Sequence, residues 1–408
     1  MSPRHVTTFI NCRQCINGEL VEDQLVVSGD TALIEKSTGE AGGRTVDLEG
    51  GIIAPGFLEL HTNGVHGFHY THFDDSESYR QKLEHISKYY VSQGITGFWA
   101  TIPTVTAGQF QKIIPNLSPW EFSAGASLLG AHCEGPYLHP SKKGAHNASL
   151  FLDPSQSPES TYGEPNLSNI KLVTLAPELP QSSALIQNLS SRGIRVSLGH
   201  SNATYAQGVE GLKAGATGLT HVLNAMSALH HRDPGLPGLV GLPLSTVSSH
   251  PPATPGTEPP YYSIIPDGHH IHPNVVSLLA RSGPQKAILI TDSIELLGLP
   301  DGTYPGHAQI PFNQTKMGTK VVIEGTDTLI GGCCSLQEGV RNLMKWSGCD
   351  VAQAVRCVTE NVASFMSLED RGKLEEGRRA DFVVLDDDGN LRETWVAGKK
   401  VWEKSQTV

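Results

Sequence analysis

Long hydrophobic runs are missing from this chain. No apolar stretch approaches the roughly 20 residues that a helix needs to cross a bilayer. The first residues also lack a charged segment followed by the apolar core of a signal peptide. We therefore expect no membrane partner and predict a cytoplasmic protein.

Positive charge is also scarce. The 408 residues carry 30 Lys and Arg against 41 Asp and Glu, which gives a net charge of −11, and no dense basic run occurs. Because affinity for nucleic acid depends on a basic face that displaces counterions, this balance argues against a nucleic-acid partner. Any anionic ligand would have to be held by local groups.

Cysteine is sparse, and its count of seven is odd. The scattered spacing argues against a disulfide framework and agrees with a reducing compartment. Cys12 and Cys15 form a C-x-x-C, but no second pair or His pair accompanies them, so we interpret them as structural. Cys333 and Cys334 lie in a glycine-rich loop with no base beside them in the sequence, which does not favour a nucleophile.

What the chain does contain is a series of short apolar runs, each of the length of a buried strand. Stretches with helical periodicity separate several of them. Strands that alternate with helices indicate parallel βα units, and eight units predict a (β/α)₈ TIM-type barrel. The runs are 56–61, 97–102, 128–134, 172–176, 196–200, 218–222, 262–265 and 287–292, and the helical stretches include 79–92, 180–191, 203–214 and 273–281.

The two ends of the chain have a different texture. Residues 5–53 and 380–402 alternate apolar and polar positions between Gly and Asp turns, which predicts antiparallel strands. Neither end has enough strands to close a core, so we expect both ends to form one small, discontinuous β-sandwich. The predicted boundaries are 1–54 and 370–408 for the sandwich and 55–369 for the barrel.

Two further features concern the later part of the chain. Helices are predicted near 336–347 and 351–359, before the second part of the sandwich. The Pro-, Ser- and Thr-rich segment 243–260 predicts a surface loop between strands six and seven, with a mobile lid as one role.

Four residues suited to metal chemistry fall at the ends of predicted strands: Glu134, His200, His221 and Asp292. The catalytic groups of such barrels gather at these ends. A single His at a strand end usually has only a hydrogen-bonding role. That role does not account for three metal-type ligands at the ends of three separate strands. A metal held by three protein ligands keeps a fourth coordination position for a water, whose pKa then falls to about 7. We predict that Glu134, His200 and His221 hold one metal and that Asp292 is the general base and acid.

The metal count rests on two other strand ends. His61 and Asn63 follow strand one, where some barrels of this architecture carry His-x-His for a second metal, and 176–178 offers no bridging Lys. We predict a single ion and place His61 and Asn63 on the substrate or second-metal side. Zinc is the predicted metal, although iron, cobalt and manganese accept the same donors.

Taken together, several motifs resemble the N-acetylglucosamine-6-phosphate deacetylases of the amidohydrolase superfamily over nearly the whole chain. The motifs are 55–59, 134–136, 143–147, 176–178, 199–203, 221–226, 267–270 and 291–292. The resemblance implies hydrolysis of the acetamide of N-acetyl-D-glucosamine 6-phosphate, in amino-sugar catabolism, with an activated water as nucleophile. It implies the same metal ligands and the same role for Asp292.

The resemblance also implies that the sugar phosphate contacts His146, Asn224, the Ala225 backbone, Arg232 and His270. A guanidinium suits phosphate because its planar fork donates paired bonds, and in a homodimer Arg232 would reach the neighbouring subunit's site. The chain departs from the family pattern at His61, where Gln is frequent, and at 331–334, where a Ser or another small residue usually follows the glycine.

Two other functions compete. A cyclic-amide hydrolase or deaminase on the same scaffold usually needs His-x-His on strand one and often a Lys on strand four, and the sequence has neither. A catalytically silent sugar-phosphate sensor would be favoured if a metal ligand or Asp292 were absent. All four residues are present.

Overall fold

The computed structural model describes residues 5–37, 43–241 and 258–405. The predicted surface loop at 243–260 lies outside these residues except for 258–260. None of the described helices combines the length and the apolar character needed to cross a bilayer. All seven cysteines are free thiols, and Cys15 and Cys133 are among the buried ones.

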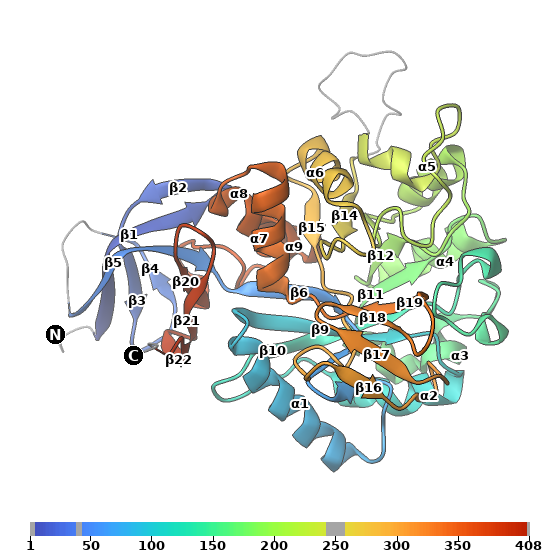
Figure 1. Ribbon diagram of the computed structural model, residues 1–408, viewed down its shortest axis with the longest axis horizontal. Helices are drawn as coiled ribbons and strands as arrows, with labels where there is room; N and C mark the ends of the chain where they lie inside the picture. Colours follow the sequence, from blue (N-terminus) through green and yellow to red (C-terminus); the bar gives the residue numbers. More distant parts are fainter. Residues whose placement is uncertain (1–4, 38–42, 242–257, 406–408) are drawn as a thin grey trace.

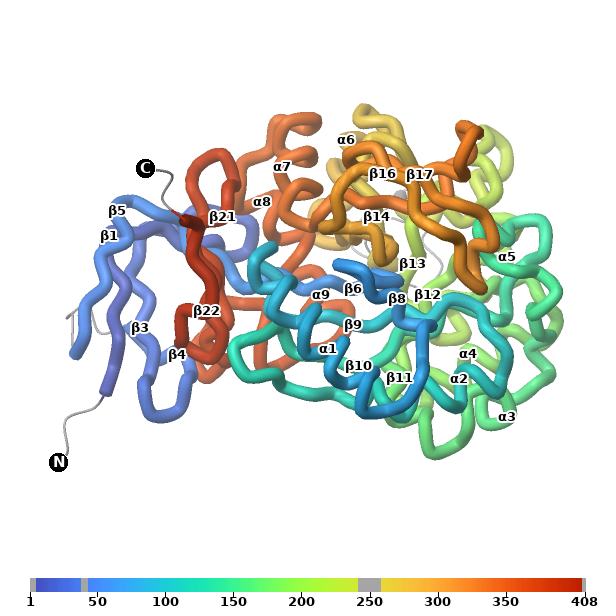
Figure 2. Tube along the Cα trace, turned by 60° about the horizontal axis from the view of Figure 1, so that its bottom comes forward, coloured from blue at the N-terminus to red at the C-terminus, as the bar shows by residue number. Residues whose placement is uncertain are grey.

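An eight-stranded sheet forms the centre of the molecule, and all of its neighbouring strands are parallel (Figures 1 and 2). Its two ends meet, because the Asp292 N–H donates to the His61 carbonyl over 2.9 Å and Thr62 bridges Ser293. The sheet is therefore curled like a TIM barrel, and each of the eight predicted strands is present. In sheet order they are β15 (Ala287–Leu289), β14 (Tyr261–Ile264), β13 (Gly218–Leu219), β12 (Arg195–Leu198), β11 (Ile170–Leu175), β10 (Ser127–Glu134), β9 (Ile95–Pro103) and β6 (Phe57–Thr62).

Helical segments follow the strands of this sheet. In α1, Asp75 caps the N-terminus by accepting from the Ser78 N–H, and the buried residues Tyr79, Leu83, Ile86 and Tyr90 recur at the spacing of one helix face. The α-helices are α1 (Ser76–Val91), α2 (Ala107–Ile113), α3 (Pro158–Tyr162), α4 (Ser182–Ser191), α5 (Tyr205–Lys213) and α6 (Pro273–Ser282). Short 3₁₀ segments are η1 (Ile114–Leu117), η2 (Pro140–Lys142), η3 (Ala148–Leu150), η4 (Glu164–Asn169) and η5 (Leu236–Gly241).

Strands from both ends of the chain pair with one another, as predicted. The prediction that all of them are antiparallel is wrong, because β1 runs parallel to β5, with Thr7 opposite Arg44. β20 runs antiparallel to β5, with Phe382 opposite Pro55, and Phe9 packs edge-on against Phe382 and Trp395 in a separate core. Hydrogen bonds join all of these strands into one sheet beside the barrel (Figure 1); a separate sandwich domain and its boundaries stay predictions. The strands are β1 (Val6–Ile16), β2 (Glu19–Glu22), β3 (Leu25–Ser28), β4 (Ile34–Glu35), β5 (Arg44–Pro55), β20 (Phe382–Leu385), β21 (Leu391–Val396) and β22 (Lys399–Glu403).

Helices α7 (Leu336–Ser347), α8 (Val351–Arg356) and α9 (Glu360–Met366) lie between the terminal sheet and the barrel strands (Figures 1 and 2). The helix predicted at 351–359 ends three residues earlier, and α9 was not predicted.

Two small sheets were also not predicted. One is the hairpin of β7 (Gly64–Val65) and β8 (Phe68–His69). The other follows β15 and contains β16 (Gly302–Tyr304), β17 (Gln314–Met317), β18 (Lys320–Ile323) and β19 (Leu329–Gly332), all antiparallel.

Candidate metal centre

The four predicted metal and catalytic residues all lie at the carboxyl edge of the central sheet. Glu134 is the last residue of β10, whereas His200, His221 and Asp292 lie two or three residues beyond β12, β13 and β15. The strands predicted to end at 200, 222 and 292 are shorter because the backbone turns there: φ is +48° at His200, +33° at His221 and +45° at Asp292. Non-glycine residues seldom adopt this left-handed conformation, and it is typical of functional sites.

Three donor atoms converge at this edge. The Nε2 atoms of His200 and His221 lie 3.1 and 3.0 Å from Oε1 of Glu134, and 3.1 Å from each other. Tetrahedral zinc, with bonds of about 2.0–2.1 Å, places neighbouring ligand atoms roughly 3.3 Å apart. The spacing of the three atoms therefore fits one small divalent cation.

The outer ring nitrogens of both histidines support a cation at this point. Nδ1 of His200 donates to the Lys142 carbonyl over 2.8 Å, and Nδ1 of His221 donates to the Asn224 carbonyl over 3.2 Å. A carbonyl can only accept, so in the neutral rings each Nε2 carries a lone pair and faces a carboxylate oxygen. A cation between these atoms resolves that repulsion, and carbonyl partners of this kind are common behind metal-bound histidines.

Glu134 stays ionised although it is buried. Burial by itself raises its pKa, but the charge on His61 and the hydrogen bond from His146 hold the pKa well below the ordinary value. Its side chain is only 4% exposed, so little water competes for it. The centre therefore offers one carboxylate and two imidazole nitrogens.

His146 is a hydrogen-bond donor to this centre. The Thr104 N–H donates to Nδ1 of His146 over 3.2 Å, so the ring proton lies on Nε2, which is 3.4 Å from Oε2 of Glu134. Sequence reasoning missed Thr104, because a lone Thr after a strand carries no recognisable signal.

Asp292 is held by two residues from the end of β6. Asn63 Nδ2 donates to Oδ1 of Asp292 over 2.8 Å, and Nε2 of His61 lies 3.2 Å from the same oxygen. Burial raises the pKa of Asp292, but the charge and hydrogen bond of His61 outweigh it and keep the pKa far below the ordinary value. His61 and Asn63 thus orient a carboxylate, and Asn63 also lines the cavity described below. Their place on the substrate or second-metal side stays a prediction.

A cavity of about 350 Å³ opens over this centre. Glu134, His200, His221 and Asp292 line it together with the predicted substrate residues His146, Asn224, Ala225 and His270. Within the described part of the chain, the buried Nδ2 of Asn224 has no hydrogen-bond partner. That free donor is suited to a polar group of a bound ligand.

The structure does not bring every predicted residue to this cavity. Arg232 is exposed in the segment before η5 and is not among the residues that line the cavity. Asp267, in contrast, was not predicted as a site residue, but it accepts from Nδ1 of His270 over 2.6 Å and orients that ring. The spacing of Asp267 and His270 could have indicated this pair.

Residues 52–401 match the amidohydrolase family, and the chain belongs to this family. Its similarity to N-acetylglucosamine-6-phosphate deacetylases is confirmed. The chain is 38% identical to that enzyme of Danio rerio over 99% of this chain and 98% of the relative, and 34% identical to that of Homo sapiens over 98% and 96%. Among solved structures, the Pasteurella multocida N-acetylglucosamine-6-phosphate deacetylase superposes with a TM-score of 0.82 at 25% identity, over 97% of this chain and 99% of the other.

Proposed function

We propose that this protein hydrolyses the acetamide of N-acetyl-D-glucosamine 6-phosphate to D-glucosamine 6-phosphate and acetate, in amino-sugar catabolism. The observation that carries the proposal is the convergence of Glu134, His200 and His221 beside Asp292 at the floor of a cavity. The names of the curated relatives support the choice of substrate.

The chain's own residues divide the chemistry. A single divalent ion held by Glu134, His200 and His221, for which we propose zinc, would polarise the acetamide carbonyl and acidify a water. Asp292 accepts a proton from the attacking water and then delivers it to the leaving amine nitrogen. Because Asn63 and His61 both engage Oδ1, Oδ2 of Asp292 is the atom available for this transfer.

The walls of the cavity position the sugar. Nδ2 of Asn224 is a donor without a partner among the described residues, so it can donate to the sugar. His270 presents a ring that Asp267 orients. His146 lines the cavity and donates toward Glu134, so its ring is held beside the place that we propose for the acetamide. We assign the phosphate to Arg232 of a second subunit, because a guanidinium suits phosphate and the cavity of one chain lacks Arg232.

This assignment of Arg232 requires a homodimer, which we place in the cytoplasm. Free cysteines agree with a reducing compartment. The terminal strands would form a small sandwich, divided from the barrel near residues 54 and 370, beside the catalytic barrel.

The direct test is acetate release from N-acetyl-D-glucosamine 6-phosphate by protein of measured metal content. The unphosphorylated sugar and the 6-phosphate of N-acetylgalactosamine serve as comparison substrates. The second sugar is included because a relative at 28% identity is an N-acetylgalactosamine-6-phosphate deacetylase. We expect the glucosamine derivative to give the highest kcat/KM.

Asp292→Asn is the matched catalytic variant. It should keep the metal content and lower kcat by about 10²–10⁴-fold, the usual contribution of general acid–base catalysis. Near-normal turnover would remove Asp292 from the mechanism. Binding of the sugar phosphate without acetate release by the native protein would instead favour a sensor, and ammonia release from an aminated ring would favour a deaminase.

A further inference from the structure

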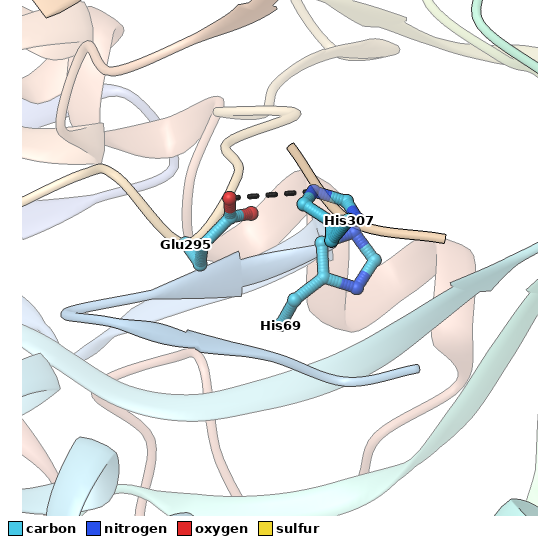
Figure 3. Close-up of side chains that lie close together, drawn as sticks. All are labelled: His69, Glu295 and His307. Atoms are coloured by element: carbon cyan, nitrogen blue, oxygen red, sulfur yellow. Dashed lines mark ion pairs between the residues drawn. The ribbon is translucent and has the colours of Figure 1, made fainter. Parts of the chain in front are cut away.

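A second group of metal-type ligands lies beside the cavity, outside the site described above. His69 ends β8, Glu295 follows β15, and His307 lies between β16 and β17. These segments lie far apart in the sequence and meet only in the fold (Figure 3). One ligand atom from each of the three residues lies within 4.8 Å of the other two.

The three side chains are almost removed from water. His69 is 2% exposed and Glu295 is 7% exposed, and the side chain of His307 is 11% exposed. Nε2 of His307 lies 3.4 Å from Oε1 of Glu295, so the two groups form an ion pair when the ring is protonated. A buried carboxylate needs such compensation, because the loss of hydration is costly.

An ion pair alone leaves the cluster unsatisfied. Among the described residues, Oε2 of Glu295 and Nε2 of His307 are both buried without a hydrogen-bond partner, and so is Nε2 of the neighbouring His72. Gln314 donates to Oε1 of Glu295 over 3.1 Å, which leaves Oε2 unmatched. The ring of His72 lies 4.8 Å from that of His307, centre to centre. Three buried polar atoms of the described residues therefore lack a hydrogen bond in one small region, and of these only Nε2 of His307 has an ionic partner.

The outer nitrogens of these rings have backbone and side-chain neighbours. The Thr71 N–H donates to Nδ1 of His69 over 3.2 Å, and the Thr71 hydroxyl lies 2.7 Å from the same atom. The Gln309 N–H donates to Nδ1 of His307 over 3.4 Å, and Oε1 of Gln309 lies 3.2 Å from it. Without an ion these N–H contacts place the ring proton on Nε2; an ion at Nε2 would shift that proton to Nδ1, which would then donate to the Thr71 hydroxyl or to the Gln309 oxygen. Burial, with smaller effects from neighbouring charges, lowers the pKa of His69 to about 3. That ring is neutral at physiological pH, so no net proton need be lost when Nε2 binds an ion.

We propose that His69, Glu295 and His307 form a second divalent transition-metal site, with zinc as the ion and His72 as a candidate fourth ligand. Two or three imidazoles with one carboxylate are a donor set that zinc accepts. The ion would join the β7–β8 hairpin, the segment after β15 and the β16–β17 connection. His69, Gln309 and Ile310 from these segments line the cavity, so the ion would fix one of its walls.

Metal stoichiometry tests this proposal. Protein stripped with a chelator is dialysed against buffered free Zn²⁺, and the bound zinc per chain is measured by elemental analysis. The native protein should bind two equivalents. His200→Asn should bind one, at the second site, and His307→Gln should also bind one, at the first site. The control His85→Gln changes an exposed ring outside both clusters and should bind two.

The outcomes separate this site from the catalytic one. A native protein that saturates at one equivalent, or a His200→Asn variant that binds none, would overturn the second site while leaving the proposed deacetylation standing. If His307→Gln does not fold, the His200→Asn stoichiometry still decides. In that variant, added Zn²⁺ should raise Tm, because binding to the folded state alone stabilises it; an unchanged Tm would contradict the proposal.

Discussion

The side-chain amide of Asn63 donates a hydrogen bond of 2.8 Å to Oδ1 of Asp292, across the point where the two ends of the curled sheet meet. The bond fixes the carboxylate while the other oxygen stays available for proton transfer. The curl of the sheet and the orientation of the Asp292 carboxylate are therefore linked through this part-buried contact.

Asn63→Ala should lower kcat by about tenfold to a hundredfold with little change in KM, because a hydrogen bond to a charged group contributes about 1.5–3 kcal/mol. Steady-state acetate release measures this. The matched control is Asn313→Ala, which removes an exposed amide that donates to Glu324 over 2.9 Å and should leave kcat unchanged. An Asn63→Ala enzyme with native kcat would show that Asp292 needs no such support.

Glu134→Gln should remove one equivalent of metal per chain. The substitution keeps the size of the side chain but deletes the only anionic ligand of the His200 and His221 centre. Metal affinity should fall by more than the roughly 10–100-fold that is lost when an outer partner is removed. Equilibrium dialysis against buffered Zn²⁺ checks this, with the exposed Glu84→Gln as control. Full metal retention would rule out Glu134 as a ligand.

The Asp267 and His270 pair should make stability depend on pH. Burial lowers the pKa of His270, but the hydrogen bond and charge of Asp267 and the charge of Asp292 raise it above the ordinary value. A raised histidine pKa stabilises the fold fully below the unfolded-state pKa, near 6.5. That stabilisation is lost as the pH rises through the folded-state pKa.

His270→Gln therefore should destabilise the protein more at pH 5.5 than at pH 9. Urea unfolding at both pH values measures the difference in free energy of unfolding between native and variant protein, and the exposed His85→Gln serves as control. A loss of stability of equal size at both pH values would assign His270 a packing role alone.

Asn224→Ala should raise KM for the sugar phosphate by about tenfold and change metal content little. Nδ2 of Asn224 is buried without a partner in the described structure, so a substrate oxygen is the group that would satisfy it. Initial rates over a range of substrate concentrations measure KM, and the exposed Asn274→Ala is the control. An unchanged KM would mean that the substrate does not use this donor.

The sequence predicted the parts of this site that depend on strand ends. Glu134, His200, His221 and Asp292 each follow an apolar run, and a parallel sheet brings such ends together. The exact ends of the shorter strands were not predictable, because the left-handed turns at His200, His221 and Asp292 involve residues that rarely adopt them.

Other parts carried no local pattern. The β16–β19 sheet was missed because its strands are only three or four residues long, and the first two, such as Gln314–Met317, are largely polar. His69, Glu295 and His307 meet only through long-range folding, so no spacing in the sequence could indicate the cluster. The role proposed for Arg232 requires a second subunit, and one chain's sequence does not specify the geometry of a dimer.

Arg232 permits a test of the proposed dimer that does not require the structure of the dimer. If Arg232 acts in the partner's site, Arg232→Ala and Asp292→Asn homodimers should each be weak. A mixed dimer then holds one complete site, because the Asp292→Asn subunit supplies Arg232 to the intact Asp292 of its partner.

Coexpression of the two variants in equal amounts should yield half mixed dimers, so activity should return to about a quarter of the native value. Acetate release from the unfractionated mixture measures this, and mixed dimers isolated by two different affinity tags should reach about half of the native value. If Arg232 acted within its own chain, each mixed dimer would lack either Arg232 or Asp292 at both sites. Activity would then stay at the level of the separate variants, and the assignment of the phosphate to the partner's guanidinium would be wrong.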